Sequence, residues 1–190
     1  MRNEKIRDLV LAAMFFAIGL VLPFVTGQIP EIGKALCPMH LPVLICSLVL
    51  GWKYGAVVGI LLPITRSLIF QFPPLYPNAV AMTFELAAYG FAAGFIYGLF
   101  RKAGFTTAAK RIIALYIALI VAMIVGRLVW GAAQWVLLSL GGKAFTLEAF
   151  LAGAVTGSIP GIVIQLLLVP SLAFTLESVL SGDKSVRKAD

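Results

Sequence analysis

Long, nearly uncharged apolar stretches are the feature that most constrains this chain. They are separated by charged, glycine-rich or proline-rich breaks, and they run over approximately 9–25, 39–50, 56–70, 78–100, 112–138 and 147–180. A helix needs about 20 apolar residues to cross the hydrocarbon core of a bilayer. The stretches are apolar all round, whereas strands of an outer-membrane barrel alternate apolar and polar residues. We therefore predict an all-α integral membrane protein, with residues 1–190 forming one membrane domain of six transmembrane helices.

Composition supports a lipid environment. Charged residues make up 12% of the chain and hydrophobic residues 61%, whereas a soluble domain carries roughly 25% charged residues. Too few polar residues remain to cover a water-facing surface. No small-residue cleavage site follows the first stretch, so we interpret it as a retained span and not as a signal peptide. The stretch at 39–50 is short and is expected to cross only partly, and Pro160 and Pro170 are expected to kink the last span.

The basic residues predict the orientation, because cytoplasmic loops of membrane proteins are rich in Lys and Arg. With six spans, two basic residues fall on one side, Lys34 and Lys143. Eleven fall on the other: Arg2, Lys5, Arg7, Lys53, Arg101, Lys102, Lys110, Arg111, Lys184, Arg187 and Lys188. We therefore predict that both termini are cytoplasmic. The net charge of +7 then reflects topology and attraction to lipid headgroups, and it does not indicate nucleic-acid binding.

We place three charged residues at membrane depth: Arg66, Glu85 and Arg127. A charge exposed to lipid is costly, so each is expected to face the bundle interior and to have a partner. We expect the three to meet at a cavity open to the outside. Glu85 can neutralise only one arginine. Either the pair merely locks two helices, or the remaining positive charge holds an anionic ligand group.

Helical spacing adds further candidates for a ligand site. Asn78, Met82, Glu85 and Tyr89 share one face of one span, and Arg127, Trp130 and Gln134 share one face of the next. A cationic fork, an amide and an indole suit a small polar ligand with an apolar body.

Two residues near the predicted outer surface leave alternatives open. His40, the single histidine, is either a ligand or gating contact or a plain interfacial residue. Tyr76, with Phe70 and Phe72, either covers a ligand or belongs to an interfacial aromatic belt.

Motifs for catalysis are missing from the sequence. It contains no G-x-x-x-x-G-K-[ST] phosphate loop, no H-E-x-x-H and no G-x-S-x-G. We find no carboxylate or nucleophile placed to act with His40. Cys37 and Cys46 have no zinc or redox spacing and are interpreted as packing residues. We predict no catalytic residue, no metal and no cofactor, so the chain is not expected to be an enzyme or to hydrolyse ATP itself.

The layout resembles a known family, the substrate-binding S-components of energy-coupling factor (ECF) vitamin transporters. The resemblance covers nearly the whole chain. It rests on size, six spans, a basic start and the motif Ala13-Met-Phe-Phe-Ala17. The long loop from Gly27 to Pro38 and the stretch from His40 to Gly59 also fit.

The resemblance implies a role for each part of the chain. Ala13 and Ala17 would dock a membrane coupling subunit driven by two cytoplasmic ATPases, which use the ATP. A vitamin site would lie on the outer side of the bacterial cytoplasmic membrane, built from the first and third loops and spans four to six. The first loop would be its lid, and the whole subunit would topple to release the ligand inward.

The substrate is a separate question, since members of this family bind different vitamins. Three buried charges that sum to +1 favour a carboxylate or phosphate. Pantothenate is the first expectation, followed by riboflavin, pyridoxine-type vitamins, a thiamin precursor and cobalamin. The alternatives are an autonomous secondary transporter or channel, and a non-transport membrane assembly protein or enzyme.

Overall fold

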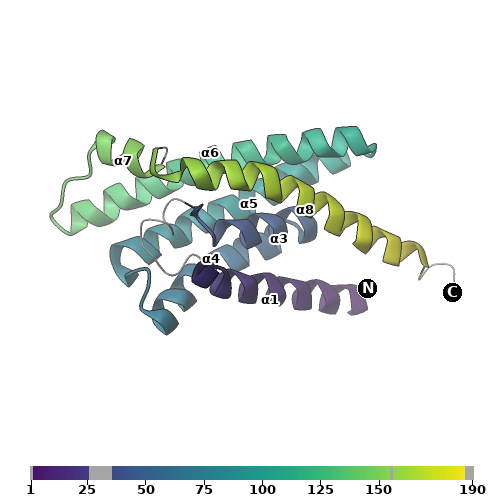
Figure 1. Cartoon of the computed structure of the whole chain (residues 1–190), viewed down its shortest axis with the longest axis horizontal. Helices are drawn as coiled ribbons and strands as arrows, with labels where there is room; N and C mark the ends of the chain where they lie inside the picture. Colours follow the sequence, from purple (N-terminus) through teal and green to yellow (C-terminus); the bar gives the residue numbers. More distant parts are fainter. Residues whose placement is uncertain (1, 26–35, 155, 187–190) are drawn as a thin grey trace.

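The computed structural model describes residues 2–25, 36–154 and 156–186, and all secondary structure within these ranges is helical (Figure 1). The elements are α1 (Arg2–Val25), α3 (His40–Leu50), α4 (Trp52–Phe70), the π-helical turn η1 (Leu75–Ala79), α5 (Val80–Lys102), α6 (Ala108–Leu140), α7 (Leu147–Ala154), the short 3₁₀ turn η2 (Thr156–Ser158) and α8 (Ile159–Val186). The predicted all-α class is confirmed for these residues.

Five segments of the described chain are long and apolar enough to cross a membrane. They are Glu4–Phe24, Trp52–Phe70, Leu75–Lys102, Ala108–Leu140 and Leu147–Leu180. The sixth predicted stretch is the shorter apolar helix His40–Leu50. Its 11 residues rise about 16 Å, which is roughly half the hydrocarbon thickness. The count of six crossings therefore stays a prediction, which depends on how deeply α3 lies.

The last predicted span is interrupted earlier than its prolines indicated. Helix α7 is described up to Ala154, η2 spans Thr156–Ser158, and α8 begins at Ile159. Pro160 lies in the first turn of α8, where a missing N–H costs no intrahelical hydrogen bond. Pro170 lies inside α8 without ending it. The interruption places the end of α7 and the start of η2 beside the cavity described below.

Glycines allow α3, α4 and α5 to approach closely. A Cβ added at Gly90 would meet the backbone of Gly55, and one added at Gly59 would meet the backbone of Leu86. Gly94 similarly faces Ser47, whose hydroxyl donates to the Gly90 carbonyl. These contacts lie within one chain, as expected for small residues at helix interfaces in lipid. Gly98, one turn further along α5, faces open space.

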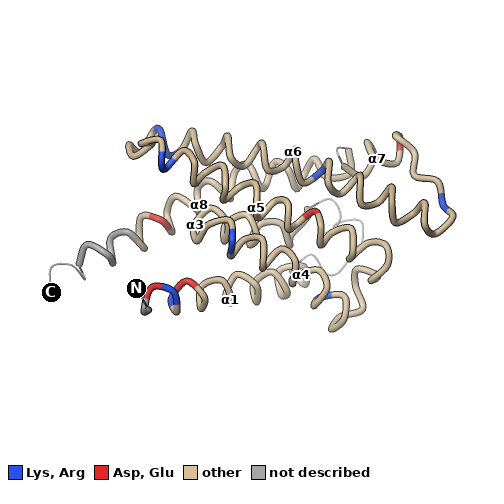
Figure 2. The backbone as a smooth tube through the Cα atoms, turned by 180° about the vertical axis from the view of Figure 1, so that it is seen from behind, with Lys and Arg blue, Asp and Glu red and all other residues tan. Residues whose placement is uncertain are grey.

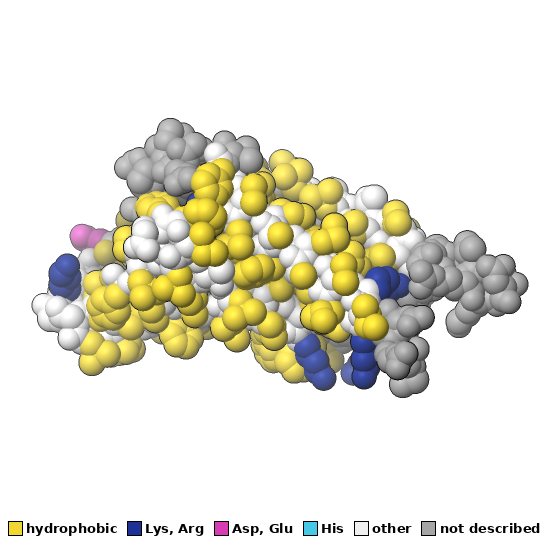
Figure 3. All heavy atoms as spheres, turned by 90° about the horizontal axis from the view of Figure 1, so that it is seen from below, with side chains coloured by type: hydrophobic (Ala, Val, Ile, Leu, Met, Phe, Trp, Pro, Cys, Tyr) yellow, Lys and Arg dark blue, Asp and Glu magenta, His cyan; other side chains and the backbone are white. Residues whose placement is uncertain are grey.

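The outer surface matches a lipid-facing protein. The face seen in Figure 3 is largely apolar, and most of the basic side chains in view lie toward one end. Figure 2 shows Lys and Arg mostly at the end of the bundle where α1 begins and α8 ends. Helix α1 is the most peripheral long span, with 17% of its apolar window buried against 50% for Leu75–Lys102.

Candidate functional site

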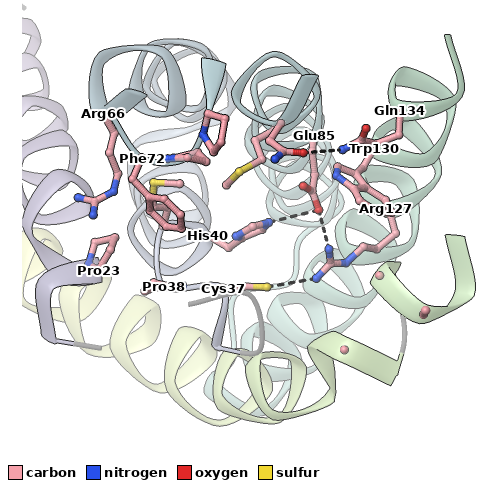
Figure 4. Close-up of a pocket in the computed structure, with 18 residues that line it drawn as sticks. Pro23, Cys37, Pro38, His40, Arg66, Phe72, Glu85, Arg127, Trp130 and Gln134 are labelled. Carbon is pink, nitrogen blue, oxygen red and sulfur yellow. Dashed lines mark hydrogen bonds and ion pairs between the residues drawn. The ribbon is translucent and has the colours of Figure 1, made fainter. Parts of the chain in front are cut away.

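A cavity of about 520 Å³ lies among the helices, near the end of α1 and the start of α3 (Figure 4). This volume falls in the range of small-molecule sites. In the described part of the chain, α1, α3, α4, α5, α6 and α7 contribute to the wall, together with η1, η2 and the segments before α3 and η1, while α8 does not. The lining residues are Pro23, Cys37, Pro38, Met39, His40, Arg66, Phe72, Pro73, Pro74, Asn78, Met82, Glu85, Arg127, Trp130, Gln134, Ala152, Gly153 and Gly157.

Glu85 on α5 is the centre of the charged cluster at this cavity. Its Oε1 lies 2.9 Å from Arg127 NH1 on α6 and 3.3 Å from His40 Nε2 at the start of α3. Glu85 and His40 are both almost fully buried. The expectation that no carboxylate stands near His40 is therefore wrong. The two residues are distant in sequence, and only the packing of α3 against α5 brings them together.

Cys37 joins the same cluster from the segment before α3. The second terminal nitrogen of Arg127 donates to Cys37 Sγ at 3.4 Å. The backbone of Cys37 is left-handed, with φ of 47°, a conformation that is uncommon for a residue other than glycine. Burial raises the pKa of the Cys37 thiol above its usual range, and the nearby Arg127 guanidinium opposes this shift only in part. The thiol is therefore protonated at neutral pH.

Uncharged polar groups follow Arg127 on α6, with Trp130 one turn and Gln134 two turns further along, and Asn78 faces Gln134 from η1. Gln134 Nε2 lies 3.5 Å from Asn78 Oδ1, at the long limit of a hydrogen bond. Trp130 packs against Phe145 and Phe150, with ring centroids 6.0 and 6.3 Å away. Gly153 makes room for the indole, because a Cβ there would stand 2.6 Å from it. This part of the wall offers an aromatic face and an amide pair.

Arg66 on α4 stands apart from the carboxylate. Figure 4 shows it near Pro23, on the opposite side of the cavity from the Glu85–Arg127 pair. NH1 of Arg66 donates to the Leu20 carbonyl on α1. The guanidinium carbon lies 5.1 Å from the ring centroids of both Phe24 and Phe70. NH2 is buried and has no hydrogen-bond partner among the described residues.

Seven of the nine side chains predicted to bind ligand line this cavity: His40, Arg66, Asn78, Glu85, Arg127, Trp130 and Gln134. Tyr89 does not, because it is fully buried and His40 lies against it, with ring centroids 5.0 Å apart. Tyr76 does not either, since 53% of it is exposed and its hydroxyl donates to the Leu137 carbonyl. The predicted lid is the first loop, from Gly27 to Pro38. Residues 27–35 of it lie outside the described residues, whereas Cys37 and Pro38 at its end line the cavity.

The predicted docking residues are exposed. Ala13 and Ala17 lie one turn apart on α1, on a face that also exposes Val10, Met14 and Val21. The opposite side of α1 packs inward through Ala12 and Gly19. The small-residue pair thus lies on the exposed face of α1.

Sequence reasoning missed one buried charge. Glu177 on α8 falls inside the predicted 147–180 span and is 8% exposed, so Arg66, Glu85 and Arg127 are not the only charges within the spans. Glu177 accepts hydrogen bonds from Tyr97 on α5 at 2.7 Å and from Arg111 on α6 at 2.6 Å. The sequence did contain a signal for this buried charge, because a carboxylate stands within the last apolar stretch.

Fold and cavity define a class: a multi-pass helical membrane protein with an internal cavity whose mainly apolar wall includes buried charged side chains. Comparison with known protein families then identifies the family within this class. The family model described as "ECF transporter, substrate-specific component" matches residues 7–173, and the chain belongs to this family. Its members are transport subunits and not enzymes. No curated protein and no solved structure matches the chain.

Proposed function

We propose that this protein captures a water-soluble vitamin or vitamin precursor outside the bacterial cytoplasmic membrane. It then delivers the ligand inward together with an ECF coupling subunit and two cytoplasmic ATPases. The observation that carries the proposal is the cavity itself. Its wall contains Arg66, Glu85 and Arg127 within a largely apolar bundle, and charges kept at membrane depth generally serve a pathway or a ligand.

The size and lining of the cavity support a compact ligand. A volume of about 520 Å³ suits pantothenate, a pyridoxine-type vitamin, a thiamin precursor or riboflavin. Cobalamin, with a corrin ring and a nucleotide tail, is far larger and is the least favoured of the candidates. Pantothenate remains first, because it combines a carboxylate with an amide and hydroxyls.

The proposed orientation follows from the position of the cavity relative to the basic end. Pro23 near the end of α1, Asn78 before α5 and Gln134 near the end of α6 line the cavity. They lie away from the end where α1 begins and α8 ends, which carries most of the basic residues (Figure 2). The proposal therefore places the basic end and both termini in the cytoplasm, with the cavity opening outward. It takes α3 as a short sixth crossing.

The energy source is proposed to be external to the chain. The sequence has no phosphate loop, so a coupling subunit must bring the ATPases. The exposed Ala13–Ala17 pair on α1 is the proposed contact for this subunit, because small residues permit close helix packing in lipid.

The direct test is identification of the ligand. Small molecules carried through purification in detergent should be released by denaturation and identified by mass spectrometry, with an unrelated membrane protein purified in parallel as the control. Isothermal titration calorimetry on ligand-free protein should then give a 1:1 complex with one vitamin from the panel above. Failure of every vitamin to bind the folded protein would reject the function.

A further inference from the structure

The two cavity arginines have different electrostatic surroundings. Arg127 is paired with Glu85 at 2.9 Å, and its other terminal nitrogen donates to Cys37. Arg66 has no carboxylate partner among the described residues: its contacts are one carbonyl and two phenyl rings. Two positive charges and one negative charge therefore leave the excess charge on the Arg66 side of the cavity.

Both arginines retain an unused hydrogen-bond donor, since NH2 of Arg66 and Nε of Arg127 are buried and have no partner among the described residues. In Arg66, which is 1% exposed, this donor is a terminal nitrogen of a guanidinium that has no carboxylate beside it in the described part of the chain. A buried donor of this kind is costly to leave unsatisfied, especially on a charged group. The contacts with Phe24, Phe70 and Leu20 hold the guanidinium in place, so the free edge is pre-organised to receive an acceptor.

An anion at Arg127 would meet a different environment. It would approach Glu85, whose carboxylate already lies 2.9 Å from the guanidinium, and like charges at such a distance repel. Beyond Arg127, the wall offers the amides of Asn78 and Gln134 and the indole of Trp130. These groups suit an uncharged part of a ligand.

We propose that Arg66 is the single anchor for an anionic group, carboxylate or phosphate, of the ligand, and that the Trp130 side of the cavity takes an uncharged portion. This inference rests on the proposed function and narrows it. It selects the acidic vitamins or phosphate esters among the candidates. It also assigns recognition of the acidic group to a residue on α4. The vitamin site that the family resemblance implies does not include this helix.

The test compares matched acidic and neutral ligands. Three pairs would be titrated by calorimetry into purified protein: pantothenate and pantothenol, pyridoxal phosphate and pyridoxal, and riboflavin phosphate and riboflavin. We expect the acidic member of one pair to bind at least tenfold more tightly than its neutral partner. Arg66→Gln should weaken the acid about 10- to 100-fold and leave the neutral ligand within twofold, whereas Arg66→Lys should retain part of the preference.

A second variant separates the two arginines. Glu85→Gln combined with Arg127→Gln removes the ion pair without changing the net charge of the cavity, so the preference for the acid should persist if Arg66 is the anchor. Loss of the preference in this double variant would overturn the inference. A neutral ligand binding as tightly as its acid would overturn it too, while the proposed function would stand. Absence of binding by all six ligands would count against both.

Discussion

Glu85 on α5 and Arg127 on α6 form a buried ion pair, with 2.9 Å between Oε1 and NH1. This pair explains how α5 and α6 carry charges at membrane depth, and it leaves Arg66 as the cavity's uncompensated cation among the described residues. The partners lie on neighbouring helices and both line the cavity. The packing of α5 against α6 therefore affects the shape of the cavity.

Removing one member of this ion pair should lower the unfolding free energy more than removing both. Arg127→Met leaves the Glu85 carboxylate buried beside His40 alone, and we expect a loss of roughly 3–5 kcal/mol of unfolding free energy. The double variant Glu85→Leu with Arg127→Met should recover much of this loss. Thermal unfolding of ligand-free protein, followed by tryptophan fluorescence, measures the stability of these two variants and of Glu85→Leu alone. Strict additivity of Glu85→Leu and Arg127→Met would show that the residues are not coupled.

The exposed alanine pair on α1 should control assembly with the coupling subunit. Ala13→Trp together with Ala17→Trp fills the surface where another helix would approach, so co-purification of the coupling subunit and ATPases should be abolished. Ligand affinity should be unchanged, since neither residue lines the cavity. Ala132→Trp, at an exposed alanine on α6, is the matched control. Full assembly of the double variant would mean that docking uses another face.

Gly90 should be intolerant of even one added methyl group. A Cβ at this position would meet the backbone of Gly55 on α4, which cannot rotate away. We expect Gly90→Ala to lower the stability by roughly 1–3 kcal/mol. Gly98→Ala, on the same helix but facing open space, should be neutral or stabilising by up to about 1 kcal/mol. Equal melting temperatures for the two variants would contradict the close α4–α5 contact.

Glu177 should hold α5, α6 and α8 together at the end opposite the cavity. It accepts from Tyr97 and Arg111, and Arg101 NH1 lies 3.6 Å from its other oxygen. Glu177→Gln should cost roughly 1–3 kcal/mol, and Tyr97→Phe about 1 kcal/mol. Glu148→Gln, at an exposed carboxylate on α7, serves as the control. Chemical denaturation in mild detergent would measure these differences, and equal midpoints for Glu177→Gln and the control would refute the role.

Cys37 should react slowly with thiol reagents at neutral pH. Burial raises its pKa above the usual range, so the nucleophilic thiolate is the minor form at pH 7. In a Cys46→Ala background, labelling by a small methanethiosulfonate should accelerate about tenfold per pH unit up to pH 9, without levelling off. A thiol with an ordinary pKa near 8.5 begins to level off by then. A plateau below pH 8.5 would contradict the raised pKa, and Cys37→Ser gives the background rate.

Periodicity along single helices predicted much of the cavity wall. Spacing on 78–100 grouped Asn78, Glu85 and Tyr89 on one face, and the first two line the cavity. Tyr89 does not, because His40 arrives from α3 and covers it. A helical pattern indicates which face of the helix a residue occupies. Which residues on that face line the cavity depends on the side chains that neighbouring helices pack against it.

The sequence by itself determined that the chain is helical and suited to a membrane, because apolar runs of this length cannot be covered by so few polar residues. It also determined that a carboxylate and two arginines had to be sheltered from lipid. Only the tertiary structure decided that Glu85 pairs with Arg127 and contacts His40, while Arg66 is left with an unsatisfied donor. Pairing depends on the rotation and depth of separate helices, and these follow from close contacts such as Gly90 against Gly55, which no local pattern encodes.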